Sequence, residues 1–214
     1  MEKGGLAFGP IPAAAQVLCI DMQRLFLEPG EWYGADGVAI LPQVERLVAA
    51  RSVQTLFTRF ITASSPESAQ GCWKRYYRHW HRVTQVEAGT DMLELHPSLV
   101  PYARVGQVFD KRGHNAFEAP VVGPQGPTFR EYIRKLAPPA LIVCGIETDV
   151  CVLATVLSAV DLGYRVIIAR DAVASSDPSA HRACLELVYP RFDQQIELAS
   201  TEAILAQWQG VTYD

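Results

Sequence analysis

The residue of this sequence best placed for covalent chemistry is Cys151. It ends the stretch Leu141-Ile-Val-Cys-Gly-Ile-Glu-Thr-Asp-Val-Cys, in which Gly145 breaks an apolar run and a helical pattern begins near Thr148. With Thr148 as N-cap, Cys151 falls in the first helical turn, where backbone amides and the helix dipole favour a thiolate. A free cysteine is more often a small buried core residue. The turn makes Cys151 a candidate nucleophile, and its neighbours decide between the two interpretations.

A cysteine that attacks a carbonyl group needs a thiolate, a group that manages its proton, and donors for the oxyanion. Lys111 can lower the pKa of the thiol by supplying positive charge. Asp21 can take the proton, deliver it to the leaving group and pair with Lys111. The turn from Gly145 to Cys151 presents backbone N–H groups for the oxyanion. The alternatives are that Asp21 caps a helix and that Lys111 is a solvated loop residue.

Strand and helix signals alternate along the chain. Short apolar runs predict strands at 16–21, 53–59, 107–110, 140–144, 164–169 and 195–198. Helical spacing and capping signals predict helices at 38–51, 128–136, 149–162, 177–189 and 200–208. This alternation indicates an α/β protein with a three-layer αβα Rossmann-like fold, in which a six-stranded, mainly parallel sheet carries helices on both faces. We expect one domain spanning residues 1–214.

Four chemically capable side chains stand at or just after the predicted carboxyl ends of strands: Asp21, Arg59, Lys111 and Cys151. Parallel strands joined by right-handed crossovers end at one edge of the sheet, and ligands bind in the crevice beyond that edge. Residues that are far apart in sequence are therefore expected to meet there. This convergence is the main argument from the residues themselves for an active site.

The stretch 60–106 departs from the regular alternation. At helical spacing, four aromatic side chains share one face, with basic residues around them: Trp73, Tyr76, Tyr77 and Trp80. This face forms either a wall of the substrate pocket, with Trp73, Tyr77 and Trp80 as lining residues, or an aromatic stripe packed on the domain or on a partner subunit.

Two further residues are candidates for contact with substrate. Arg59 either binds an anionic group of the substrate or forms an ion pair within the fold. His114, three positions after Lys111, is a candidate from its position alone.

Three segments carry a resemblance to a known family. Cys19-Ile-Asp-Met-Gln, Val108-Phe-Asp-Lys and Cys144-Gly-Ile-Glu-Thr-Asp-Val-Cys resemble the signatures of isochorismatase-like cysteine hydrolases. The resemblance extends over residues 16–207 and implies a catalytic triad of Asp21, Lys111 and Cys151. It also implies a non-proline cis peptide bond between Ile146 and Glu147, with the amides of Glu147 and Cys151 as the oxyanion hole.

Departures from that family narrow the expected reaction. Nicotinamidases of the family bind a metal through an Asp-x-His motif after the second strand, where this chain reads Thr58-Arg-Phe-Ile-Thr. We therefore expect neither a metal nor another cofactor. Members that cleave isochorismate lack the cysteine, so Cys151 indicates carbonyl chemistry through a thioester. The expected reaction is hydrolysis of a C–N bond in a small amide, carbamoyl or ureido compound.

Composition excludes several other classes. The 214 residues carry a formal net charge of −4 and no basic stripe, so no nucleic-acid partner is expected. No apolar stretch approaches the ~20 residues that span a bilayer, and the first residues lack the layout of a signal peptide. Five cysteines at irregular spacing argue against a disulfide framework. We expect a cytoplasmic protein with a small-molecule substrate; the resemblance adds a homodimer or homotetramer.

Two rival functions remain open on the same fold. A redox-sensing or thiol-reactive protein would also use Cys151, with Cys19 or Cys144 as the resolving thiol, although neither is close in sequence. A non-catalytic binding protein would not need all of Asp21, Lys111 and Cys151. A dinucleotide-binding enzyme is excluded because no Gly-x-Gly-x-x-Gly follows the first strand.

Overall fold

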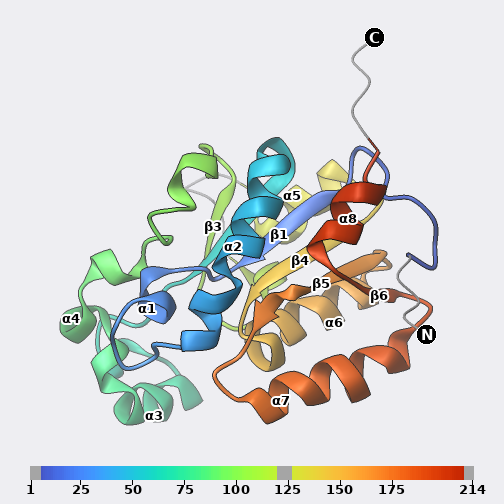
Figure 1. The fold of residues 1–214 in the computed structure, drawn as a ribbon. Helices are drawn as coiled ribbons and strands as arrows, with labels where there is room; N and C mark the ends of the chain where they lie inside the picture. The colour runs from blue at the N-terminus through green and yellow to red at the C-terminus, as the bar shows by residue number, and fades with distance from the viewer. Residues whose placement is uncertain (1–5, 120–126, 210–214) are drawn as a thin grey trace.

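The computed structural model of the chain describes residues 6–119 and 127–209. Its centre is a six-stranded sheet in the order β3-β2-β1-β4-β5-β6 (Figure 1). Every neighbouring pair in this order is parallel. The strands are β1 Gln16–Ile20, β2 Thr55–Phe60, β3 Val108–Lys111, β4 Leu141–Ile146, β5 Val166–Ala174 and β6 Ile196–Ala199. The predicted α/β fold with six strands is confirmed, and the fully parallel order follows from the helical crossovers.

Helices connect the strands. The α-helices are α1 Arg24–Leu27, α2 Ala35–Ala50, α3 Cys72–His79, α4 Gln85–Ala88, α5 Phe129–Leu136, α6 Leu153–Asp161, α7 Pro178–Ala183 and α8 Thr201–Gln207. Short 3₁₀ turns occupy Ser52–Gln54, Pro66–Ser68, His81–Val83, Thr90–Leu93, Val100–Tyr102, Ala116–Glu118 and Tyr189–Phe192. Two π-helical turns, Thr148–Val152 and Cys184–Val188, precede α6 and follow α7.

Strand β1 runs through the middle of the sheet, and all five of its residues are buried. Its side chains alternate between two hydrophobic cores, as the pleat of a strand requires. Val17 and Cys19 belong to the core under α2 and α8, whereas Leu18 and Ile20 belong to the core under α5 and α6. Figure 1 shows these helix pairs on opposite faces of the sheet. A strand with both faces buried reads as a continuous apolar run, which is why the sequence predicted it.

Strands β1 and β4 lie side by side where the chain order of the sheet reverses. Strands β2 and β3 extend the sheet from β1 in one direction, and β5 and β6 extend it from β4 in the other. In parallel α/β sheets this reversal opens a crevice beyond the carboxyl ends of the strands. Asp21 follows β1 and Cys151 follows β4, so the topology alone brings both to that crevice.

The irregular stretch 60–106 folds as short helices that pack at one side of the sheet (Figure 1). Its residues Tyr77, Val83 and Leu93 form a small core together with Leu25 of α1, and several aromatic side chains pack against this core. A segment of such short helices gives no long periodic pattern, which explains its weak sequence signal.

None of the helices within residues 6–119 and 127–209 has both the length and the apolar character needed to cross a membrane.

Candidate active site

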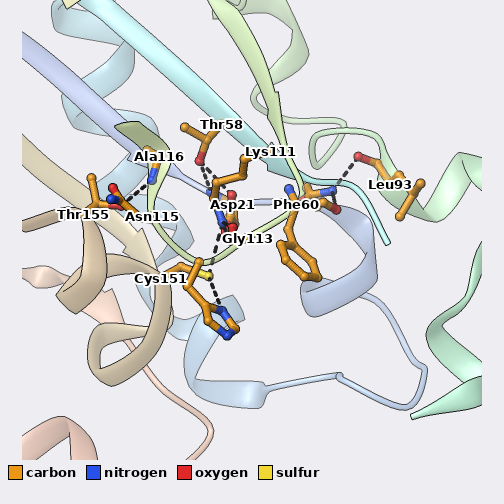
Figure 2. Close-up of polar contacts among 12 residues, drawn as sticks. Asp21, Thr58, Phe60, Leu93, Lys111, Gly113, Asn115, Ala116, Cys151 and Thr155 are labelled. Atoms are coloured by element: carbon orange, nitrogen blue, oxygen red, sulfur yellow. Dashed lines mark hydrogen bonds and ion pairs between the residues drawn. The ribbon is translucent and has the colours of Figure 1, made fainter. Parts of the chain in front are cut away.

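The side chains of Asp21, Lys111 and Cys151 lie in contact at the carboxyl edge of the sheet (Figure 2). Lys111 Nζ is 2.6 Å from Asp21 Oδ2 and 3.3 Å from Cys151 Sγ. Lysine therefore stands between carboxylate and sulfur and contacts both. The side chains of Lys111 and Asp21 are 0% and 1% exposed, and the whole Cys151 residue is 7% exposed. The sequence predicted this meeting of three residues from three separate strand ends.

Asp21 is held by the neighbouring strand β2. The Thr58 hydroxyl donates to Asp21 Oδ1 at 2.7 Å, and the Asp21 amide donates to the Thr58 carbonyl at 3.2 Å. Asp21 itself has φ of 51°, a left-handed conformation that aspartate adopts more readily than most residues. The turn allows the chain to leave β1 while the carboxylate stays over the sheet edge. Asp21 does not cap α1, whose N-cap is Gln23.

Lys111 is the last residue of β3 and is completely buried, so it is not a solvated loop residue. Besides its contacts with Asp21 and Cys151, its ammonium donates to the carbonyl of Gly113 at 3.0 Å. It also lies 5.0 Å from the centroid of the Phe60 ring. A buried ammonium is tolerated only when paired and hydrogen-bonded, and these contacts meet that requirement.

Cys151 lies within the π-helical turn Thr148–Val152 rather than a regular α-helical turn. The N-cap of this turn is Glu147, so the expectation that Thr148 is the N-cap is wrong. The Thr148 hydroxyl lies 2.8 Å from His181 Nδ1, and its carbonyl accepts from the Tyr189 hydroxyl at 3.0 Å. Residues of α7 and of the segment after it thus hold this turn in place. The local sequence around Cys151 cannot reveal such long-range contacts.

The protonation state of the sulfur also departs from the sequence-based expectation. Burial raises the pKa of Cys151 above its ordinary value, and the negative charge of Asp21 raises it further, whereas Lys111 lowers it. Burial acts to lower the pKa of Lys111, but the attraction of Asp21 and Cys151 outweighs it and leaves that pKa raised. Both directions favour a neutral thiol beside a charged ammonium at rest. The helix-terminal position does not by itself produce a standing thiolate.

His114 lies beside the sulfur, with Nδ1 3.7 Å from Cys151 Sγ. Its ring stacks on Phe60 with centroids 6.2 Å apart and is tilted against Trp73 at 5.1 Å. Burial and the positive charge of Lys111 lower the pKa of His114. The imidazole is therefore neutral near neutral pH, and the two aromatic neighbours fix its orientation.

A cavity of about 220 Å³ opens over the sulfur. Five of its eleven lining residues have large aromatic side chains: Phe26, Trp32, Phe60, Tyr76 and Trp80. Its polar and remaining lining is formed by Glu31, His114, Glu147, Val150, Cys151 and Ser176. Two of the sequence-predicted contacts, Trp80 and His114, line this cavity. Because Cys151 lines the cavity, a small molecule bound there can reach the thiol.

Arg59 is not at the cavity. Its guanidinium donates to both carboxylate oxygens of Asp110, at 2.7 and 3.0 Å, and to Glu94. Strand pairing explains this position: Arg59 and Asp110 are register partners on β2 and β3. The prediction of a substrate contact is replaced by the alternative, an ion pair within the fold.

Trp73 and Tyr77 line a different cavity, of about 600 Å³. Tyr77 is buried in the small core of that segment. Trp73 packs against three lining residues of the cavity over Cys151: Phe60, Tyr76 and His114. Both therefore support the wall of the cavity over Cys151 and do not form it, because successive positions of α3 face different sides of a helix.

Several lining residues were not predicted from the sequence. Tyr76 lies on the predicted aromatic face of α3 but was not among the predicted pocket residues. Phe26, Glu31 and Trp32 lie between β1 and α2, and their signal was the rule that loops after the carboxyl ends of central strands form the site. Ser176, which follows β5, carries the same signal.

Glu147 and Cys151, the predicted oxyanion donors, both line the cavity. The peptide bond between Ile146 and Glu147 is cis. Glu147 Oε1 accepts a hydrogen bond at 3.0 Å from the amide of Ser176, in the loop after β5.

The described residues contain no group of three or more His, Cys, Asp or Glu side chains placed to hold a metal ion.

The fold and the three buried side chains define the class of protein: a parallel α/β protein in which a carboxylate, an amine and a thiol lie in contact at the carboxyl edge of the sheet. A model of the isochorismatase domain matches residues 15–200. The chain therefore belongs to the isochorismatase family. No sequence match was found among curated proteins.

Solved structures support the same fold. A cysteine hydrolase from Pseudomonas syringae pv. phaseolicola 1448A is similar with a TM-score of 0.72 at 22% identity, over 97% of this chain and 98% of that one. An isochorismatase family protein from Desulfovibrio vulgaris subsp. vulgaris str. Hildenborough is similar with a TM-score of 0.73 at 20% identity, over 91% of this chain and 97% of that one. The N-carbamoylsarcosine amidase from Thermoplasma acidophilum gives 0.63 at 16% identity, over 88% and 96%.

Proposed function

We propose that this protein is a cysteine hydrolase that cleaves the C–N bond of a small amide, carbamoyl or ureido compound. The single observation that carries the proposal is the chain of contacts from the Asp21 carboxylate through Lys111 to Cys151 Sγ, beside a cavity. The family supports a hydrolase, and one of its similar structures is an amidase by name.

The first half of the reaction forms a thioester. As Cys151 Sγ attacks the carbonyl carbon, its proton passes to the Asp21 carboxylate. Lys111, 3.3 Å from the sulfur, stabilises the negative charge that develops there. Backbone amides of Glu147 and Cys151 bind the oxyanion. Collapse of the tetrahedral intermediate breaks the C–N bond, and the nitrogen takes the proton from Asp21 and leaves as ammonia or an amine.

The second half regenerates the enzyme. Asp21, again a carboxylate, accepts a proton from water while the water oxygen attacks the thioester. The C–S bond then breaks, the sulfur recovers its proton, and the carboxylic acid is released. In sum, one water is consumed and one C–N bond is cleaved. These reaction steps need no redox partner. They are compatible with a thiol that is neutral at rest, because Asp21 removes its proton only during the attack.

The rival function as a thiol switch has weaker support. Cys19 and Cys144 are register partners on β1 and β4, and both are fully buried. They face each other in the core and not Cys151, so neither is a resolving thiol for it. None of the five cysteines, all of which lie in the described ranges, forms a disulfide.

The test is ammonia release from a panel of primary amides and ureido compounds. We expect turnover by the native enzyme and its loss, by at least about 10⁴-fold, in Cys151→Ala, because the covalent route is removed. Cys72→Ala is the matched control, since Cys72 is exposed on α3 and does not line the cavity. A trapped acyl group on Cys151, detected by peptide mass spectrometry after acid quench, would identify the thioester directly. Equal turnover by Cys151→Ala would refute the assignment.

A further inference from the structure

The cavity over Cys151 carries negative charge. Two carboxylates, Glu31 and Glu147, are among its lining residues, and no lysine or arginine of the described residues is. Glu31 is 31% exposed on its side chain and has one charged neighbour, the exposed Arg82, at 3.5 Å. The interaction free energy of an exposed ion pair at that distance is small, so the carboxylate of Glu31 can still attract a cationic ligand.

The positive charges of Lys111 and Arg59 are paired with carboxylates, and Arg82, beside Glu31, does not line the cavity. Lys111 lies behind the sulfur and is paired with Asp21 at 2.6 Å. His114 is the one basic lining residue in the described part of the chain, and it is neutral near neutral pH because burial and Lys111 lower its pKa. Arg59, the residue expected to bind an anion, is occupied by two carboxylates elsewhere. An anionic substrate would therefore meet no counter-charge in this wall.

The aromatic wall is organised around Trp32. Its ring stacks on Phe26 with centroids 5.6 Å apart, and it has three tilted or edge-on neighbours, each at 6.1 Å: Phe60, Tyr76 and Trp80. Aromatic faces attract cations through their quadrupole, most strongly for tryptophan. Rings set at angles to one another around a cavity that also holds carboxylates give the chemistry of a cation-binding box.

We propose that the substrate of this hydrolase is a small amide, carbamoyl or ureido compound whose acyl part bears a positive charge, held by the aromatic wall and by Glu31. The ammonium, quaternary ammonium or guanidinium group lies against Trp32 and Trp80, and the carbonyl carbon faces Cys151. This inference rests on the proposed function, because the positive charge is assigned to the substrate of the proposed hydrolase.

The volume limits the size of this substrate. A cavity of about 220 Å³ is smaller than the roughly 300–1,000 Å³ typical of sites for drug-sized ligands. It admits a short acyl chain with one compact cationic group. The charge must also be recognised strongly enough to offset its loss of hydration, which a purely apolar cavity cannot do.

The experiment compares three amides that differ in charge and little in size: betaine amide, its uncharged isostere the amide of tert-butylacetic acid, and the monoamide of malonic acid. Binding is measured by calorimetry on Cys151→Ala, so that the result does not depend on catalysis. We expect betaine amide to bind about tenfold more tightly than the isostere, and the malonic monoamide to bind most weakly. With native enzyme, kcat/KM for ammonia release should follow the same order.

Two variants test the residues. In the Cys151→Ala background, Glu31→Gln and Trp80→Leu should each reduce the preference for the cationic amide over its isostere by about threefold or more. Glu186→Gln is the control, because Glu186 is exposed on the π-helical turn after α7 and does not line the cavity. Its preference should equal that of the parent.

The outcomes separate the two proposals. Equal or tighter binding of the uncharged or anionic amide, or no binding of any of the three, overturns the cationic substrate and leaves the hydrolase to be judged by the ammonia screen. Preferential binding of betaine amide together with equal turnover by native enzyme and Cys151→Ala overturns the cysteine mechanism and leaves the cation site. A preference that Glu31→Gln and Trp80→Leu leave unchanged overturns the assignment of those residues.

Discussion

At the scale of single residues, the protonation of one buried side chain depends on its two neighbours. Asp21, Lys111 and Cys151 share one small volume from which water is largely excluded. Lys111 contacts the carboxylate at 2.6 Å and the sulfur at 3.3 Å, so it can balance only one full negative charge at a time. While Asp21 is ionised, its carboxylate pairs with the Lys111 ammonium and the sulfur keeps its proton. When the proton moves to Asp21, the ammonium of Lys111 balances the thiolate instead.

This coupling predicts opposite effects of Asp21→Asn on acidity and on turnover. Removing the carboxylate charge should lower the pKa of the Cys151 thiol, because Asp21 contributes to raising it. The pH midpoint for alkylation of Cys151 by iodoacetamide, which burial and Asp21 raise in the native enzyme, should therefore move down in the variant. Turnover should nevertheless fall by about 100-fold or more, since the group that moves the proton is gone.

Peptide mass spectrometry reads the alkylation at Cys151, with the exposed Cys72 in the same sample as a control for the reagent. Circular dichroism confirms that the variant is folded. An upward shift of the midpoint would contradict the arrangement of charges, and retention of full turnover would contradict the role of Asp21 in proton transfer.

At the scale of elements, β1 and β4 must approach closely for the strand ends to deliver their side chains. Gly145 has φ of +110°, and a Cβ built there would lie 2.0 Å from the Ile20 carbonyl oxygen. Backbone on β1 cannot give way as a flexible side chain would. This contact therefore requires the glycine that interrupts the apolar run in the sequence. Ile20 lies one residue before Asp21, and Gly145 lies six residues before Cys151.

Gly145→Ala should accordingly lower the free energy of unfolding by about 3 kcal/mol or more, combining the cost of a positive φ with that of overpacking. Gly163→Ala is the matched control, because Gly163 also has positive φ, +84°, but nothing within 4 Å of the added carbon. It should cost only about 1–2 kcal/mol. Urea unfolding of both variants measures the difference, and equal costs would mean that the contact with Ile20 is not limiting.

At the scale of the whole molecule, the irregular segment 60–106 must be fixed to the sheet for a cavity to exist. Gln23, fully buried just after β1, makes this connection. Its amide nitrogen donates to the carbonyls of Leu93 at 2.7 Å and Phe60 at 3.2 Å, and its oxygen accepts from the Phe60 amide at 2.6 Å. Every one of these contacts joins residues at least 37 positions apart.

Gln23→Leu should therefore damage both stability and binding. It leaves buried backbone groups of Phe60 and Leu93 unpaired, which costs about 2–4 kcal/mol in unfolding free energy. Because Phe60 lines the cavity, KM should rise by about fivefold or more, with a smaller change in kcat. Gln16→Leu is the control: Gln16 is also buried, but its amide makes one local bond, to Ala14 at 3.2 Å, and it does not line the cavity. An unchanged KM in Gln23→Leu would contradict the role of this connection.

The expectations of a single domain over residues 1–214, of a cytoplasmic location and of a homodimer or homotetramer stay predictions. Light scattering after gel filtration tests the last of them. A mass of two or four times the 23.6 kDa of one chain would support it, and a mass of one chain would contradict it.

The sequence by itself determined the α/β fold, the approximate position of every strand, and the meeting of Asp21, Lys111 and Cys151. The physical reason is that buried parallel strands need continuous apolar runs, and right-handed crossovers then bring all strand ends to one edge. Side chains that immediately follow such runs can be placed without knowing any packing detail. Family signatures in the same three segments carried the same information.

Only the tertiary structure decided which residues line the cavity and how burial acts on the charges of Asp21, Lys111 and Cys151. Arg59 pairs with Asp110 because the register of β2 and β3 sets these two residues side by side. Trp73 and Tyr77 line a second cavity because the short helices in segment 60–106 orient through contacts distant in sequence. The raised pKa of Cys151 depends on burial, which no local pattern records. Orientation and desolvation arise from packing between segments, and they appear only once the chain is folded.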